Sequence, residues 1–390
     1  MNKKLKETGN PAKIRRLNRD AVLSYVRVNE RTSRAELIKA LNLAPATVSV
    51  IVGELIADGL LVENGLRPAD KRNPGRPSRE IKLNSSAAYV IGLVLRIEHG
   101  VLSVDTAWSD YSGSARSGPT VVVEPEHSVE SIVDGIMDAL KRVRQEFPQT
   151  GNIISLCVGI PGVVSGDDVQ FSPNLQCIEG RELYEQLSVK VDCPITYEND
   201  VNLVVVSELQ ANSRLRSLNF SYLFISQGVG AGTALHGELW KSSGWSGEIG
   251  QLEVPFEGTN SRKLEWVIGM DGFIADKAEE SGINLDEFLA DPKKYPDDSP
   301  INQMVDTYVH YLALAIQVLN ASFDLDEVII GESSESIISY CMPRLSKILQ
   351  KSPLEITISL RGSARLSCVE GAALLALQRS LENLEDRKTA

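Results

Sequence analysis

The N-terminal region is organised around residues 32–59, which read TSRAELIKALNLAPATVSVIVGELIADG. Ser33 and Glu36 form a capping box, so we expect a short helix to begin there. A second helix is expected from about Pro45 to Asp58, because proline suits the first helical position and apolar residues follow at helical spacing. Two helices joined by such a short break are typical of a helix-turn-helix.

The flanking segments extend this unit. Residues 13–29 carry an apolar stripe at helical spacing and predict a preceding helix. On the other side, residues 60–62 and 80–83 are typical of two short strands, and the segment 64–79 between them is rich in Pro, Gly and Arg. The sequence therefore predicts a winged helix-turn-helix domain over residues 1–84.

Charge divides the chain at the same boundary. Residues 1–84 hold 17 Lys and Arg against 9 Asp and Glu, whereas the full 390 residues hold 40 against 52. The head thus has a balance of +8 and the remainder a balance of −20. A basic head on an acidic body indicates two tasks, and the body would repel nucleic acid.

Composition excludes several classes of protein. No apolar run approaches the ~20 residues of a membrane helix, and no apolar segment follows the charged N-terminal residues, as it would in a signal peptide. The five cysteines are scattered and form no Cys-x-x-Cys pair, which favours reduced thiols. We therefore expect a cytoplasmic protein with no membrane contact.

From residue 85 onward, predicted strands alternate with predicted helices. Apolar strands are expected at 89–95, 101–107, 120–123, 153–159, 222–226 and 327–330. Helices are expected at 128–146, 203–210, 301–322 and 364–382. This alternation predicts an α/β body with mixed or parallel sheets.

Several motifs follow one another along the chain. The head carries Leu43-Ala44-Pro45-Ala46-Thr47-Val48-Ser49 and Gly75-Arg76-Pro77. The body carries Gly159-Ile160-Pro161-Gly162, Ser172-Pro173-Asn174-Leu175, Glu198-Asn199-Asp200, Gly228-Val229-Gly230-Ala231-Gly232 and Gly244-Trp245-Ser246-Gly247-Glu248-Ile249-Gly250. In this order they resemble the ROK family of transcriptional regulators.

The resemblance implies a fold and a division into domains. It implies an N-terminal winged helix-turn-helix followed by a two-lobed actin-like or sugar-kinase (ribonuclease H-like) body. The first lobe would comprise residues 85–205 and 360–390. The second lobe, 206–359, would carry dimer contacts and residues that face the sugar.

The chain departs from the kinases of this family in the loop that binds ATP phosphates. Those kinases carry Asp-x-Gly-Gly-Thr, in which the glycines let backbone amides approach phosphate. The matching stretch, Val94-Leu95-Arg96-Ile97-Glu98, lacks the Asp and both glycines, and Glu98 would repel phosphate. We expect no cofactor and no kinase activity, so Asp200, at the position of the family's catalytic base, would be vestigial.

The family's zinc site is also expected to be absent. The resemblance places its one histidine and three cysteines at Gln251, Phe256, Gly258 and Lys263. None of these side chains offers a thiolate or an imidazole, so we expect no metal.

The resemblance maps the family's sugar-contacting set onto Asn174, Asn199, Asp200, Glu248, Gln251 and Glu265. Planar carboxylates and amides can each hold two hydroxyl groups of a sugar. Gln251 replaces a histidine, but its amide can still donate and accept. We expect a sugar or sugar derivative as the effector.

DNA contacts are expected from the recognition helix and the wing. The first residues of a recognition helix face base edges in the major groove, which here gives Ala46, Thr47, Ser49 and Val50. None is basic, so we expect hydroxyl hydrogen bonds and contacts with thymine methyl groups. Phosphates would be neutralised by Arg15, Arg16 and Arg19 of the first helix and by wing residues including Arg67, Arg72 and Arg76.

Together these expectations predict a sugar-responsive repressor of carbohydrate-utilisation genes. It would bind a palindromic operator as a homodimer or higher homo-oligomer. Sugar bound between the lobes would change their closure and the spacing of the paired heads. Two alternatives remain open: an active sugar kinase with a DNA-binding head, and a body that senses a protein partner instead of a sugar.

Overall fold

The structure is a computed structural model. It describes residues 11–29, 31–66, 79–84, 88–98, 100–123, 128–146, 152–256, 258, 260–295, 299–332, 335–353, 355–362 and 364–389. Most of the predicted wing lies outside the described residues, and so do Arg67, Arg72 and Arg76. Their assignment to DNA contact stays a prediction.

The head is a winged helix-turn-helix, as predicted. It contains α1 (Pro11–Asn29), α2 (Arg34–Leu41), α3 (Pro45–Ala57), β1 (Leu61–Leu66) and β2 (Arg79–Leu83). The Ser33 hydroxyl accepts a hydrogen bond from the Glu36 backbone N–H at 3.3 Å, which confirms Ser33 as the N-cap of α2. Asn42 ends α2 in the left-handed conformation, with φ of 52°, and so turns the chain into α3.

The first sheet of the body has the strand order β10-β7-β3-β4-β5, with β6 also paired to β4. Its strands are β3 (Ala88–Glu98), β4 (Val101–Asp110), β5 (Arg116–Ser117), β6 (Val121–Val122), β7 (Asn152–Ile160) and β10 (Ile195–Asn199). β3, β7 and β10 run parallel, and β4 is antiparallel to β3. β3 is buried on both faces, which explains its continuous apolar sequence.

Helices cover both faces of this sheet. Tyr89, Ile91 and Leu93 of β3 pack in one cluster with α4 (Val129–Glu146) and α5 (Glu182–Lys190). The intervening Val90 and Val94 pack in another cluster with α6 (Asp200–Ala211) and α12 (Ala364–Thr389). Alternation of side chains along one strand therefore divides the core into two layers.

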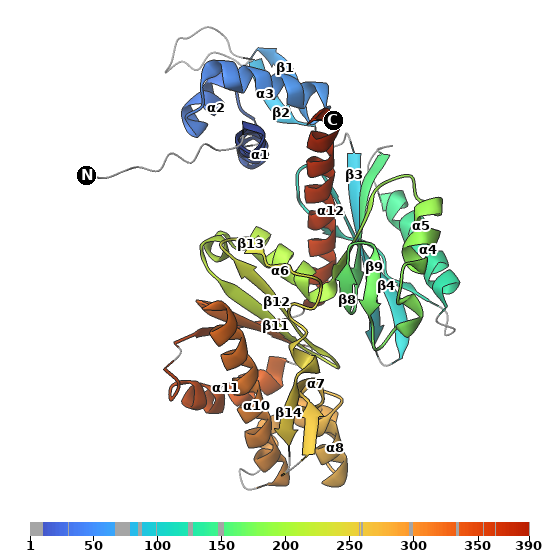
Figure 1. The fold of residues 1–390 in the computed structure, drawn as a ribbon, viewed down its shortest axis with the longest axis vertical. Coiled ribbons are helices and arrows are strands. Elements are labelled where there is room, and N and C mark those ends of the chain that lie inside the picture. The colour runs from blue at the N-terminus through green and yellow to red at the C-terminus, as the bar shows by residue number, and fades with distance from the viewer. Residues whose placement is uncertain are drawn as a thin grey trace, which may run out of the picture.

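The second sheet has the order β13-β12-β11-β16-β17. Its strands are β11 (Phe220–Ile225), β12 (Val229–Leu235), β13 (Glu238–Leu239), β16 (Glu327–Glu332) and β17 (Thr357–Arg361). α6 packs on one face, while α10 (Pro300–Phe323) and α11 (Glu335–Leu349) pack in the cluster on the other. α6 thus lies between the two sheets (Figure 1).

Smaller elements surround this frame. They are the hairpins β8 (Val163–Ser165) with β9 (Asp168–Phe171) and β14 (Glu253–Phe256) with β15 (Asn260–Lys263), the helices α7 (Leu264–Ile268), α8 (Phe273–Glu280) and α9 (Leu285–Ala290), and 3-10 helices at Gln176–Ile178, Ser213–Ser217, Ile249–Gln251 and Pro292–Lys294. No helix in the described ranges is both long enough and apolar enough to cross a membrane.

α12 connects the body to the head. Figure 1 shows it running from beside α6 up to the winged helix. One hydrophobic cluster includes Val26 of α1, Tyr111 after β4 and Ala376 of α12. Arg27 Nε also donates a hydrogen bond to the Tyr111 carbonyl oxygen at 3.2 Å. The head is therefore packed onto the first sheet through both apolar and polar contacts.

The α/β class and all the long predicted elements are confirmed. The two hairpins, the strands β5, β10, β12, β13 and β17, and the helices α5, α7 to α9 and α11 were not predicted. The lobe boundaries at residues 205 and 360 stay predictions, because α6 contacts elements of both sheets.

Candidate ligand pocket and recognition helix

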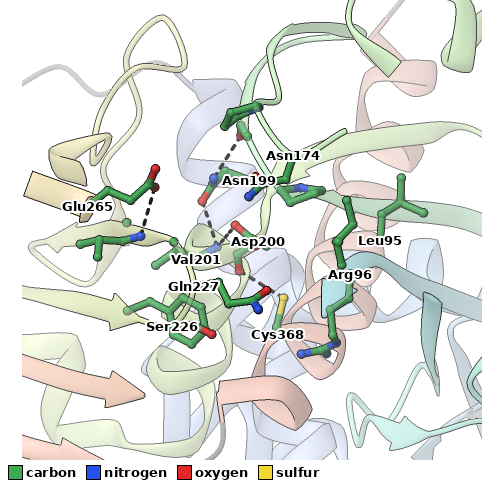
Figure 2. Close-up of a pocket in the computed structure, with 18 of the residues that line it drawn as sticks. Leu95, Arg96, Asn174, Asn199, Asp200, Val201, Ser226, Gln227, Glu265 and Cys368 are labelled. Carbon is green, nitrogen blue, oxygen red and sulfur yellow. Dashed lines mark hydrogen bonds between the residues drawn. The ribbon is translucent and has the colours of Figure 1, made fainter. Parts of the chain in front are cut away.

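A cavity of about 170 Å³ lies where β3, the start of α6 and the β11–β12 turn meet (Figure 2). A single water needs only about 10–15 Å³ of such space, so the cavity has room for a small molecule. The cavity is lined by all six residues of the predicted sugar-contacting set: Asn174, Asn199, Asp200, Glu248, Gln251 and Glu265. Residues spread over 92 positions thus meet in one place, while sugar binding itself stays a prediction.

Asn199 is the N-cap of α6. Its Oδ1 accepts hydrogen bonds from the backbone N–H groups of Val201 at 2.9 Å and Asn202 at 3.1 Å. Its Nδ2 donates to the Gly162 carbonyl oxygen at 3.0 Å. Both ends of this amide are engaged, so Asn199 fixes the helix start and the 161–162 loop around the pocket.

Asp200 is the first residue of α6 and points into the cavity (Figure 2). Burial raises its pKa to about 6, although the Val201 N–H at 2.9 Å and the charge of Arg96 favour the ionised form. Its carboxylate is therefore held by a helix N-terminus and can accept hydrogen bonds from hydroxyl groups of a ligand.

Glu248 and Glu265 complete a group of three carboxylates. Burial, followed by the charges of Asp200 and Glu265, raises the pKa of Glu248 to about 7. Glu265 Oε2 accepts a hydrogen bond from the Val229 backbone N–H at 3.4 Å. Gly247 has φ of +93°, and a Cβ there would lie 1.6 Å from the Ala231 carbonyl oxygen, so only glycine can precede Glu248.

The segment that matches the phosphate loop is regular strand. β3 pairs with β4 without interruption from Val94 to Glu98. Arg96 Nε donates to Asp105 Oδ2 at 2.8 Å, and Asp105 Oδ1 accepts from the Thr120 hydroxyl at 2.7 Å. At this part of the cavity wall the backbone is a regular strand and not a loop. The Arg96 side chain is held by Asp105, which is in turn hydrogen-bonded to Thr120.

Two contacts tie the loop after β13 to β10 of the first sheet and to the β8–β9 hairpin, and sequence reasoning missed both. Lys241 Nζ forms an ion pair with the buried carboxylate of Glu198, which also accepts from Asn202 Nδ2 at 2.9 Å. Trp245 stacks on Phe171 of β9 with ring centroids 5.8 Å apart. No local pattern marks such pairs, because their partners lie 43 and 74 residues apart in the sequence.

The residues at the family's zinc positions do not fit zinc. Gln251, Phe256, Gly258 and Lys263 supply neither thiolate nor imidazole. Within the described ranges, no three His, Cys, Asp or Glu side chains are arranged to hold a metal ion. Instead, Lys263 Nζ donates to Gln251 Oε1 at 2.7 Å.

The recognition helix presents the predicted residues outward. α3 buries Val48, Ile51, Val52 and Leu55 against the head core. Ala46, Ser49 and Val50 are exposed, Val50 to 57%, and Thr47 is half-buried. Their position on the outer face is compatible with base contact, which stays a prediction.

The role expected for Arg19 is wrong. Its side chain is only 5% exposed and forms an ion pair with Asp58 at 2.5 Å, so it is not available to a phosphate. Arg15 is 58% exposed but pairs with Glu54 of α3. These arginines balance the acidic residues of the recognition helix, and the side chain of Arg16 lies outside the described part.

Known proteins resemble both the head and the body of this chain. A sequence model described as "ROK family" matches residues 95–379, and one described as "Winged helix-turn-helix DNA-binding" matches residues 18–62. The xylose repressor of Caldicellulosiruptor bescii is 25% identical over 64% of this chain. The chain spans 61% of that relative's length. The xylose repressor of Staphylococcus xylosus is 24% identical and is matched over 93% of this chain and 95% of its own.

Solved structures share the fold. A ROK family transcriptional regulator, a homologue of the Escherichia coli MLC protein, superposes with a TM-score of 0.77 at 19% identity, covering 96% of this chain and 98% of its own. A ROK family glucokinase from Streptomyces griseus, bound to glucose and AMPPNP, gives a TM-score of 0.59 at 18% identity. That match covers 75% of this chain and all of the glucokinase.

Proposed function

Because the chain belongs to the ROK family and carries a winged helix-turn-helix ahead of the ROK region, we propose that it is a sugar-responsive transcriptional repressor of carbohydrate-utilisation genes. One observation supports this most strongly. The same chain joins an outward-facing recognition helix to a small pocket lined by carboxylates and amides. Similarity to a xylose repressor over nearly the full length supports the same function.

The charge of the pocket favours an unphosphorylated sugar. Asp200, Glu248 and Glu265 all face one cavity. A phosphate near such carboxylates would be repelled by about 1–4 kcal/mol for each charge pair at 4 Å, depending on the local dielectric. The names of the relatives make D-xylose the first sugar to test.

Isothermal titration tests the sugar part of the proposal. D-xylose, D-glucose and glucose 6-phosphate are titrated into the full chain. We expect a neutral sugar to release or absorb heat on saturable binding, and the phosphate ester to bind at least tenfold more weakly. No saturable signal with any neutral sugar would contradict the proposal and favour a protein partner as effector.

We further propose that the body does not phosphorylate its ligand. The unbroken β3–β4 ladder and the Arg96–Asp105 pair occupy the phosphate-loop position, which supports this. The kinase alternative is favoured by the fold of the glucokinase and by Asp200, which could act as a general base. A coupled assay of ADP release with a panel of sugars decides: turnover that disappears in Asp200→Asn would establish a kinase.

Two heads are needed to read a palindromic operator, so we propose a cytoplasmic homodimer. Selection of bound fragments from genomic DNA at low salt, followed by footprinting, identifies the operator. We expect a site with two-fold symmetry near genes of sugar use. Analytical ultracentrifugation of the complex is expected to give two chains for each site, and a single bound chain would exclude the dimer.

A further inference from the structure

The side-chain amide of Gln251 is held in one orientation. Gln251 ends a 3-10 helix at the pocket, and its Oε1 accepts a hydrogen bond from Lys263 Nζ at 2.7 Å. An ammonium group can only donate, so the amide atom that faces Lys263 must be the oxygen. The NH₂ group of the planar amide is therefore turned away from Lys263.

The backbone keeps these two residues in place. The Leu264 N–H donates to the Leu252 carbonyl oxygen at 2.8 Å, which joins the segment after Gln251 to the segment after Lys263. The hairpin between them is anchored by Phe256, whose ring packs against Trp266 and Phe273 at centroid distances of 5.3 and 5.2 Å. The Lys263–Gln251 contact thus lies at an edge of the pocket where the backbone segments on either side are hydrogen-bonded to each other, on the exposed strand β15.

The NH₂ group of Gln251 has no hydrogen-bond partner among the described residues. Most of its charged neighbours in the pocket are carboxylates, which accept hydrogen bonds when ionised. An unengaged donor at the rim of an acceptor-rich cavity is free for a ligand atom.

We propose that Lys263 is a positioning residue that fixes the Gln251 amide, so that its NH₂ donates to an oxygen of the ligand and selects for an acceptor at this edge. The inference rests on the proposed sugar function. It assigns opposite roles to the two sides of the pocket: the carboxylates accept from ligand hydroxyls, and Gln251 donates to one. A ligand lacking an oxygen at that edge would be rejected.

Calorimetry with D-xylose and D-glucose at pH 8 tests the ligand contact. Gln251→Glu keeps the shape and the Lys263 contact but removes the donor, and we expect the Kd to rise at least tenfold. Lys263→Met should raise the Kd about threefold by freeing the amide, and should have no further effect in a Gln251→Ala background. Arg262→Met is the matched control, since Arg262 lies over Trp266 at 5.1 Å from the ring centroid. Wild-type affinity in Gln251→Glu, or equal effects of the two Met variants, would overturn the proposal.

A measurement without ligand separates this inference from the proposed function. The Gln251 NH₂ resonance is assigned by its loss in Gln251→Glu, and its heteronuclear NOE reports how rigid the amide is. We expect a high value in the wild type and in Arg262→Met, and a marked drop in Lys263→Met. Equal values in all three would refute positioning by Lys263. A rigid amide in a chain that binds no sugar would refute the proposed function alone.

Discussion

At the scale of single residues, the pocket carboxylates differ from surface carboxylates because they share one small cavity. Burial raises the pKa of Asp200 to about 6, and burial with two neighbouring carboxylates raises that of Glu248 to about 7. Near neutral pH, these groups are partly protonated. A protonated carboxyl can donate as well as accept, which suits a ligand covered with hydroxyl groups.

The raised pKa of Glu248 predicts how stability changes with pH. Between its ordinary value of 4.5 and about 7, the folded chain binds more protons than the unfolded chain, so the free energy of unfolding falls as pH rises through this window. Glu248→Gln removes this loss. We expect the free energy of unfolding of the variant, relative to that of the wild type, to increase by about 1–2 kcal/mol as the pH rises from 5 to 8. Urea unfolding at the two pH values measures this change.

The exposed Glu238 of β13 supplies the control for that measurement. Glu238→Gln should change stability by the same small amount at both pH values. If Glu248→Gln behaves like Glu238→Gln, burial does not perturb the Glu248 carboxyl as described.

The pair Arg19–Asp58 predicts a large effect in the head. Both side chains are at most 10% exposed, so Arg19→Met removes a buried cation that pairs with Asp58. We expect the free energy of unfolding, measured by thermal denaturation, to fall by about 3–5 kcal/mol. Arg15→Met, which breaks an exposed pair on the same helix, should cost below about 1 kcal/mol. Similar losses in both variants would contradict the burial of Arg19.

At the scale of elements, close contact between α12 and its neighbours depends on glycine. A Cβ at Gly371 of α12 would lie 1.8 Å from the Leu203 carbonyl oxygen of α6, which is backbone and cannot move aside cheaply. We expect Gly371→Ala to cost about 3 kcal/mol or more in urea unfolding. A Cβ at Gly53 of α3 meets nothing within 4 Å, so Gly53→Ala should add about 0.5–1 kcal/mol. An unchanged free energy of unfolding in Gly371→Ala would show that α12 and α6 are not packed so closely.

Most of the long helices could be predicted from sequence because each carries its own periodic signal, but α11, with 15 residues, was missed. α4 extends over 129–146 and was expected over 128–146, and the capping box of α2 marks its start. β8, β9, β14 and β15 were missed because strands of three or four residues are too short to show a period.

The candidate site was predictable only in part. Its six residues could be named from a resemblance, and the fold brings all of them to one cavity. The contacts that set their chemistry could not be predicted, because Lys263 reaches Gln251, and Arg19 reaches Asp58, only through tertiary packing. Sequence shows the residue types at a site, whereas partner choice depends on the folded chain.

At the scale of the whole molecule, described residues of the head contact the body beside Tyr111. Arg27 donates to the Tyr111 carbonyl oxygen, and burial, with a smaller effect of the charge of Asp58, raises the pKa of the Tyr111 hydroxyl to about 12. Tyr111 packs in the same cluster as α12, whose Cys368 lines the pocket. A continuous set of packed elements therefore runs from the pocket to the head.

Removing the Arg27 contact should weaken communication between sugar and DNA. We expect Arg27→Ala to bind DNA and sugar separately with wild-type affinity, but to show a smaller change of DNA affinity when sugar is added. Arg31→Ala is the control, because Arg31 is an exposed arginine of the head that pairs with Glu80. In this variant, sugar should change the DNA affinity as much as in the wild type. An unaltered response in Arg27→Ala would exclude this contact from the coupling.

In the proposed function, the occupied pocket controls the DNA-binding head. Fluorescence anisotropy of a labelled operator, titrated with the full chain with and without saturating sugar, tests it most directly. We expect sugar to change the Kd for DNA at least fivefold in the wild type and to leave it unchanged in Asp200→Asn, whose affinity for DNA without sugar stays normal. An identical Kd for wild type with and without a sugar that calorimetry shows to be bound would contradict it.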